Sequence, residues 1–301
     1  MTKLEIDAFL AIVECGSISA TAEQIFVTQS ALSRRIQTLE KELGYRLFER
    51  EKGMRAVTLT EQGRAFLSVA QKWNCVYQEA QAIRTINQKP VLHLAAISGV
   101  STYILPEIFR KIASDDSLYH LDYHSCHSWE GYSLIEHGFS DIALVEYSKK
   151  ASGQQGNVIS TPAFSTPFVL LGGLFWQGRD NIHPSTLDPH KEIRLPWNSS
   201  FELWHEFWFD NTVHPKIRLD QVTVIKDVLR DDLFAIVPKY VGRQIAKTVD
   251  GIVLCELQEG PPNEIVHCLT SVASHRKPQV LDFISMLKHS IQANEEMQCL
   301  L

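Results

Sequence analysis

The sequence has no long hydrophobic run and no excess of positive charge. Its most apolar stretch, Pro167 to Trp176, is about half the length of the roughly 20 residues that a membrane-spanning helix needs. The opening residues, Met-Thr-Lys-Leu-Glu-Ile-Asp, do not resemble a secretory leader. We therefore expect a cytoplasmic protein without membrane contact. The net charge of -6 means that any contact with an anionic partner must come from a local basic surface.

Cysteines are few and scattered. The six, at positions 15, 75, 126, 255, 268 and 299, include no Cys-x-x-Cys pair, which suits a reducing compartment. Cys255 and Cys268 could form a redox-responsive pair only if their strands were neighbours.

The cluster His120, His124, Cys126 and His127 offers common metal ligands. Because His120 and Cys126 would be about 20 Å apart in a strand, metal binding stays an alternative and no metal site is predicted.

Motifs of catalysis are also missing. The sequence has no Ser-His-Asp order, no glycine-rich phosphate loop and no metalloprotease motif, and Gly172-Gly173 alone indicates little. We therefore expect no enzyme and no cofactor. The length of 301 residues and the 45% hydrophobic content suit about two domains with a full core. A stand-alone solute-binding protein is disfavoured by the missing leader and by the first 60 residues.

What the sequence does contain is an amphipathic stretch at residues 28–44. Thr28 is a good N-cap residue, and Gly44 is a good helix stop. Between them, apolar residues recur every three or four positions and form one face: Ala31, Leu32, Ile36, Leu39 and Leu43. Amide, hydroxyl and guanidinium groups gather near the N-terminal end: Gln29, Ser30, Ser33, Arg34 and Gln37. Such groups bind base edges and phosphates, although an ordinary surface helix is the alternative.

The flanking segments favour the first interpretation. Residues 3–14 predict a helix that stops at Cys15-Gly16, and Ser17 begins a second helix to about Phe26. Short helices joined this closely are typical of a helix-turn-helix. Residues 45–60 predict a hairpin wing with a turn at Glu51-Lys52-Gly53. Residues 1–27 hold one basic and four acidic residues, whereas residues 28–60 hold seven basic and four acidic ones. Positive charge is thus concentrated in the segment expected to face DNA.

An ordered series of residues runs through this region: Phe9, Gly16-Ser17-Ile18, Ala22, Gln29-Ser30-Ala31-Leu32-Ser33-Arg34, Ile36, Leu39-Glu40, Leu43-Gly44, Leu47-Phe48, Arg50, Leu59-Thr60 and Gly63. The series resembles the winged helix-turn-helix of LysR-type transcriptional regulators. Thr21 departs from the alanine that is usual in this family, and a helix–helix contact can accommodate it. The resemblance implies a DNA-binding domain at residues 1–60.

A long helix is predicted from its cap Thr60 to just before Pro90, so residues 61–89 form a linker helix. Its apolar stripe needs a partner. The corresponding helix of the resembling family makes the dimer contact, which predicts a homodimer or homotetramer. The alternative is packing against the chain's own C-terminal domain. The stripe consists of Phe66, Ala70, Trp73, Tyr77, Ala80 and Ile83.

From Val91 the pattern changes to alternating strands and helices, which is typical of a parallel α/β unit. Strands are predicted at 91–96, 119–123, 141–145, 168–171, 193–195, 217–219, 234–237, 248–254 and 265–269, and helices at 104–112, 129–137, 200–209, 222–229 and 279–291. Two lobes, 90–161 with 268–293 and 162–267, would form domain 90–293, and residues 294–301 would be a loose tail.

This domain resembles the family's effector-binding domain, itself similar to periplasmic binding proteins. The matching residues are Leu105-Pro106, His137-Gly-Phe-Ser-Asp141-Ile-Ala-Leu-Val145 and Phe234-Ala-Ile-Val-Pro238. Arg230-Asp231-Asp232 departs from a glycine-containing turn that is common in the family. The expected fold class is thus α/β overall, with an all-α winged helix-turn-helix, a linker helix and a two-lobed C-terminal domain.

Ligands of α/β sheets bind beyond the carboxyl ends of strands, close to helix N-termini. This rule selects Ser98, Gly99, Ser101, Thr102, Ser128, Glu146, Tyr147, Trp197, Ser199 and Ser200. For each serine, helix capping is the alternative. The resemblance implies carboxylate inducers, while Glu146 could accept an amine and the two aromatic rings offer flat apolar surface. We therefore expect a small aromatic or amphoteric effector.

Together these patterns predict a LysR-type regulator that a small molecule controls. Two copies would read a dyad-symmetric site in double-stranded DNA, with RNA polymerase as a further candidate partner. Gln29, Ser30, Ser33 and Arg34 would enter the major groove. Phosphate contacts would come from Thr28, Arg35, Arg50, Lys52 and Arg55.

Overall fold

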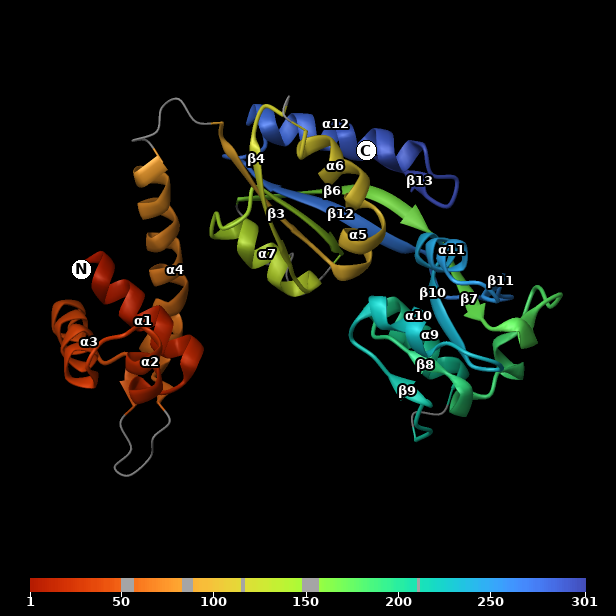
Figure 1. The fold of residues 1–301 in the computed structure, drawn as a ribbon, viewed down its shortest axis with the longest axis horizontal. Helices are drawn as coiled ribbons and strands as arrows, with labels where there is room; N and C mark the ends of the chain where they lie inside the picture. Colours follow the sequence, from red (N-terminus) through yellow and green to blue (C-terminus); the bar gives the residue numbers. More distant parts are fainter. Residues whose placement is uncertain (50–56, 83–88, 115–116, 148–156, 210–211) are drawn as a thin grey trace. The chain divides into compact units, whose positions relative to one another are not determined.

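The computed structural model describes residues 1–49, 57–82, 89–114, 117–147, 157–209 and 212–301 (Figure 1). Contacts divide the chain into two compact units. The first comprises Met1–Gln88 with His137–Phe139, and the second comprises Lys89–Glu136 with Ser140–Leu301. No helix within the described ranges is long and apolar enough to cross a membrane.

The first unit contains the predicted helix-turn-helix. Its helices are α1 Lys3–Cys15, α2 Ile18–Gln24, α3 Gln29–Leu43 and α4 Glu61–Ala82. The predicted caps are present: the Ala31 N–H donates to Thr28 Oγ1 at 3.2 Å, and Gly44 has φ 81°. The strands β1 Phe48–Glu49 and β2 Thr58–Leu59 pair antiparallel and form the base of the predicted wing. Local capping signals therefore fix where these elements begin and end.

An aromatic cluster holds this unit together. The Phe9 ring of α1 lies 5.4 Å from the ring of Phe48 and 5.2 Å from that of Phe66. The apolar face of α3 contributes Leu32, Ile36 and Leu39, all of which are buried. Thr21 is buried as well, and its hydroxyl donates to the Ser17 carbonyl at 2.6 Å, so this family departure fits within the helix packing.

The second helix ends earlier than predicted. α2 stops at Gln24, and Phe26 adopts φ 54° with its side chain 95% exposed. The left-handed conformation turns the backbone away from the helix axis, which explains why the helix cannot continue to Phe26.

The α4 stripe is only partly available to a partner chain. Phe66 and Ala70 are buried in the core of their own unit, so the predicted dimer contact is wrong for these two residues. The Trp73 and Tyr77 rings stack on each other at 5.3 Å, and the Lys3 ammonium lies 5.5 Å from the Tyr77 ring. α1 packs against this side of α4, because Phe66 and Trp73 of the stripe join the same apolar core as α1. Ile83 lies outside the described residues.

A six-stranded sheet forms the first lobe of the second unit, in the order β13-β6-β12-β5-β3-β4. The strands are β3 Val91–Ala96, β4 His120–Ser125, β5 Ile142–Glu146, β6 Val158–Thr166, β12 Glu264–Ser271 and β13 Gln298–Cys299. Strands β4, β3 and β5 are parallel, as predicted. Strands β12, β6 and β13 are antiparallel to their neighbours, because the chain leaves for the second lobe through β6 and returns through β12.

Helices cover both faces of this sheet (Figure 1). They are α5 Ser98–Tyr103, α6 Leu105–Ile112, α7 Ser128–Glu136 and α12 Pro278–Gln292. Side chains alternate along β5: Ile142 and Leu144 join the core that contains α6 and α12, whereas Ala143 and Val145 join the core that contains α7. β5 is therefore buried on both faces, as its continuous apolar run indicates.

The second lobe contains two small sheets. β7 Phe168–Gly172 pairs antiparallel with both β10 Phe234–Pro238 and β11 Val253–Cys255, and β8 Ile193–Arg194 pairs parallel with β9 Ile217–Arg218. Its helices are α9 Ser199–Trp208, α10 Ile225–Val228 and α11 Lys239–Thr248. Asp231 adopts φ 49°, so it takes the left-handed conformation at the turn where the resembling family commonly has glycine.

Three predictions about the second unit need correction. The tail is not loose, because β13 pairs with β6 and Met297 is buried. The strand predicted at 248–254 is limited to β11, and the helix α11 precedes it. β6 and α5 were not predicted. Their sequences carry weak periodicity, and neighbouring strands and helices supply the contacts that stabilise them.

Candidate functional site

The N-terminal turn of α3 presents its polar groups to solvent. Gln29, Ser30 and Arg34 are exposed, and Ser33 and Arg35 are half-buried. The hydroxyls of Thr28 and Ser30 lie 3.1 Å apart. Neither arginine forms an ion pair with any other residue of the described ranges. The buried face of α3 fixes the helix, so these groups form a rigid, uncommitted polar surface.

Three of the predicted phosphate contacts, Arg50, Lys52 and Arg55, lie outside the described residues. They stay predictions, as do the roles assigned to the residues of α3.

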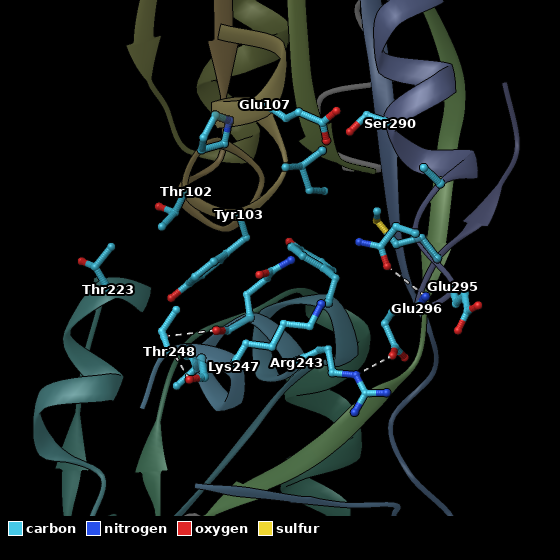
Figure 2. Close-up of a pocket in the computed structure, with 18 of the residues that line it drawn as sticks. Thr102, Tyr103, Glu107, Thr223, Arg243, Lys247, Thr248, Ser290, Glu295 and Glu296 are labelled. Carbon is cyan, nitrogen blue, oxygen red and sulfur yellow. Dashed lines mark hydrogen bonds and ion pairs between the residues drawn. The ribbon is translucent and has the colours of Figure 1, made fainter. Parts of the chain in front are cut away.

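The second unit contains a pocket of about 770 Å³ between the two lobes (Figure 2). The first lobe contributes residues of α5, α6 and α12 together with the tail, and the second contributes α11 and the segment around Thr223. The pocket is strongly charged: its basic residues are Arg110, Lys226, Arg243 and Lys247, and its acidic residues are Glu107, Glu295 and Glu296. Arg243 donates to Glu296 at 3.0 Å, which ties α11 to the tail.

Of the ten residues predicted to bind an effector, Thr102 lines this pocket. Ser98 and Gly99 form the first turn of α5, and the Ser101 hydroxyl donates to the Ser98 carbonyl at 3.1 Å. A Cβ at Gly99 would lie 2.8 Å from the Tyr240 hydroxyl, so α5 and α11 are closely packed here.

Other predicted residues serve the fold. The Glu146 N–H donates to the Ser128 hydroxyl at 3.3 Å, which brings these two predicted residues together. The Trp197 indole donates to the Ile236 carbonyl at 2.8 Å. Ser199 and Ser200 are exposed at the start of α9, where Asn198 supplies the cap.

Tyr147 is 52% exposed, and its ring lies 5.2 Å from that of His267. None of these five residues, Ser128, Tyr147, Trp197, Ser199 and Ser200, lines the pocket between the lobes. An effector-binding role for them stays a prediction.

Sequence reasoning selected Glu146 but missed Glu264 and Tyr240, which form a buried acidic cluster with it next to this pocket. Glu146, Glu264 and Tyr240 are 8%, 0% and 1% exposed. Burial raises the pKa of Glu146 to about 7, and burial together with the nearby Glu146 carboxylate raises the pKa of Glu264 well above its usual value. Burial likewise raises the pKa of the Tyr240 hydroxyl. Both carboxyl groups therefore hold their protons more strongly than a solvent-exposed glutamate does.

Two of these residues gave little signal in the sequence. Val241 and Ile245 are spaced like one helix face after Pro238, and this pattern could have revealed α11 and hence Tyr240. Glu264 gave none, because a single glutamate in a short apolar strand is not distinguishable from a solvent-facing one.

The redox alternative finds little support in the thiols. Cys255 lies in β11 and Cys268 in β12, and these strands belong to different sheets, so the condition for their pairing is not met. Burial raises the pKa of Cys126 and of Cys268 to about 12, which keeps both thiols protonated and poorly nucleophilic. No group of three metal-ligating side chains was found in the described part of the chain.

Comparisons with known proteins agree with this architecture. Residues 5–64 match the bacterial regulatory helix-turn-helix protein model of the lysR family, and residues 87–292 match the LysR substrate binding domain. A probable nitrogen assimilation transcriptional activator of Synechocystis is 32% identical over 145 residues, which are 47% of this chain and 46% of that protein. The chain thus spans about half the length of the curated relatives it matches.

Two solved structures share the fold of the whole chain. Full-length OxyR of Pseudomonas aeruginosa has a TM-score of 0.62 at 20% identity, over 99% of this chain and 98% of that one. CbnR, solved as a complex with its target DNA, has a TM-score of 0.65 at 16% identity, over 96% of this chain and 100% of that one. The two family models together cover most of the sequence, and the chain therefore belongs to the LysR family of transcriptional regulators.

Proposed function

We propose that this protein is a cytoplasmic, homo-oligomeric DNA-binding regulator that responds to a small amphoteric effector. The observation that carries the proposal is the N-terminal turn of α3. Its exposed polar groups, and guanidinium groups without an ion-pair partner among the described residues, lie on a helix whose opposite face is buried. A helix presented in this way fits the major groove. CbnR, which has the same fold, was solved with its target DNA. RNA polymerase is a candidate partner of the bound complex.

Arg34→Ala should lower the discrimination between the preferred DNA site and a scrambled one about tenfold or more. A guanidinium that binds guanine in bidentate fashion contributes about 1–3 kcal/mol of discrimination, and alanine removes this contact. The preferred site would be selected from a random DNA library with the wild-type protein, and binding would be measured by fluorescence anisotropy on that site and on a scrambled one.

The matched control is Lys41→Ala, which removes one positive charge from the exposed last turn of the same helix. It should weaken binding to both DNAs evenly. Full discrimination between the two DNAs by Arg34→Ala would contradict the assignment of α3 as the recognition helix.

We propose that the dimer contact uses an exposed apolar face of α4 that shares Ala80 with the predicted stripe. Val69 and Val76 are 52% and 57% exposed, and their separation of seven residues puts them on the same face, together with the exposed Ala80. This exposed apolar face is free to pack against the α4 of a second copy.

Val69→Glu combined with Val76→Glu should therefore shift the protein from dimer to monomer at micromolar concentration, because two copies would bring like charges together in an apolar contact. Light scattering after size-exclusion chromatography measures the mass. Gln71→Glu, which adds charge to another exposed side of α4, should leave the mass unchanged. An unaltered dimer in the double variant would place the contact elsewhere.

The effector would bind between the lobes, in the pocket that α5, α6, α11, α12 and the tail surround. Its mixed charges suit a ligand with both an acidic and a basic group. Because this ligand would contact both lobes, its binding would favour one arrangement of the lobes over another, and this difference in affinity would couple the pocket to DNA binding.

A further inference from the structure

Three polar side chains from three elements meet in the interior between the lobes. Glu146 ends β5, Glu264 begins β12 and Tyr240 lies in the first turn of α11. The pairing of Glu146 with Val266 in the β5–β12 register places Glu264 two residues along the same side of the neighbouring strand. Each side chain is at least nine-tenths buried.

Glu264 and Tyr240 lack the partners that burial normally requires. Both carboxylate oxygens of Glu264 and the Tyr240 hydroxyl have no hydrogen-bond partner within the described structure. No lysine, arginine or histidine of the described ranges forms an ion pair with either glutamate. Buried polar groups without a hydrogen-bond partner are rare in native proteins, because they lose their contacts with water and gain none in return. Two buried carboxylates offer more acceptor positions than the single Tyr240 hydroxyl can satisfy, so the cluster can accept further N–H donors.

The cluster lies directly behind the pocket. Tyr240 belongs to both, since it also lines the pocket together with Tyr103. On its other sides the Tyr240 ring packs edge-on against Phe164, at 5.8 Å, and its hydroxyl approaches Gly99 of α5. Because α11 belongs to the second lobe and β5 and β12 to the first, separation of the lobes would open the cluster toward the pocket.

We propose that Glu146, Glu264 and Tyr240 bind the ammonium group of the effector. The proposal rests on the proposed function, because it specifies the ligand class of the same site. An ammonium carries three N–H donors and a positive charge, which match two carboxylates and a phenol oxygen. The aromatic ring of Tyr240 adds a favourable surface for a cation. The basic side chains Arg110, Lys226 and Lys247 of the pocket would then face the acidic end of an amphoteric ligand.

The test uses three probes with four carbon atoms that differ in the number of ammonium groups. L-lysine and methylammonium are added as further probes, and each probe is mixed with the full chain without DNA. 1,4-Diaminobutane carries two ammonium groups, 4-aminobutanoate carries one, and succinate carries none. Thermal unfolding and titration calorimetry at pH 8 should show stabilisation by ammonium-bearing probes and none by succinate. Binding should release protons, measurable in buffers of different ionisation enthalpy, because a bound ammonium favours the ionised carboxylates.

Glu146→Gln and Glu264→Gln should each weaken binding of the ammonium probes at least tenfold, whereas Glu136→Gln, an exposed glutamate of α7, should not. The proposal is overturned if succinate alone binds, or if no ammonium probe binds at millimolar concentration. It is also overturned if both cluster variants bind the amines like wild type, or if calcium or magnesium chloride stabilises the chain and the amines do not. Because no DNA is present, these outcomes are independent of the Arg34→Ala test of DNA binding.

Discussion

Replacing His205 with leucine should lower the free energy of unfolding of the second lobe by about 1–3 kcal/mol, the range typical for leaving a buried polar group without its hydrogen-bond partner. Glu192 and His205 are 1% and 4% exposed, and His205 Nε2 lies 3.0 and 2.9 Å from the two carboxylate oxygens of Glu192. Leucine fills a similar volume but offers no donor, so the Glu192 carboxylate would be buried without a partner.

Urea unfolding followed by tryptophan fluorescence measures this change, because Trp204 and Trp208 lie in the same helix as His205. The double variant Glu192→Met with His205→Leu should regain most of the lost stability, since it removes both polar partners together. Glu206→Gln, an exposed neighbour, serves as the surface control. A loss of less than about 1 kcal/mol in the single variant would show that the pair does not stabilise the lobe.

Glu264→Gln should make the protein more stable at pH 8 while changing little near pH 5. In the folded chain the pKa of Glu146 is raised to about 7 and that of Glu264 is raised well above its usual value. Below the unfolded pKa, about 4.5, both states hold their protons and the pair does not weaken the fold. As pH rises toward and past 7, the unfolded chain has already lost protons that the folded chain retains, so stability falls.

Glutamine removes this titration and keeps the shape of the side chain. We expect a gain of about 1–3 kcal/mol at pH 8, because glutamine carries no charge that the folded chain must bury at this pH. Thermal unfolding at several pH values measures it, with Glu136→Gln, an exposed glutamate of α7 in the first lobe, as the control. A wild-type stability that rises between pH 5 and pH 8 with no difference from Glu264→Gln would contradict the assignment. The same experiment verifies that the variant used in the ligand test is folded.

The N-terminal unit was predictable because its determinants are local. Helix α3 begins and ends at Thr28 and Gly44 through contacts within four residues of each, and its apolar period identifies the face that is buried. The same signals set the boundaries of α1 and the start of α4 at Thr60. Capping and periodicity depend on neighbouring residues in the chain, so they can be read before any fold is known.

The partner of each apolar face was less predictable. The period of α4 predicts an apolar stripe but does not specify what covers it, and Phe66 and Ala70 pack within their own unit. The tail gave no signal of order, because β13 depends on pairing with β6, more than one hundred residues earlier in the chain. Pairing of this kind is decided by the assembled sheet, since an edge strand of two residues has little preference of its own.

Helix α3 and the buried acidic cluster show what the sequence alone can predict and what it cannot. The sequence by itself determined the family, the α3 helix with its exposed Gln29, Ser30 and Arg34, and the α/β character of the second domain. Only the tertiary structure decided that Glu146, Glu264 and Tyr240 meet, because antiparallel pairing of β5 with β12 and the packing of α11 bring together residues that lie far apart in the chain. A helix face follows from a period of 3.6 residues, whereas a site between two lobes requires the whole fold.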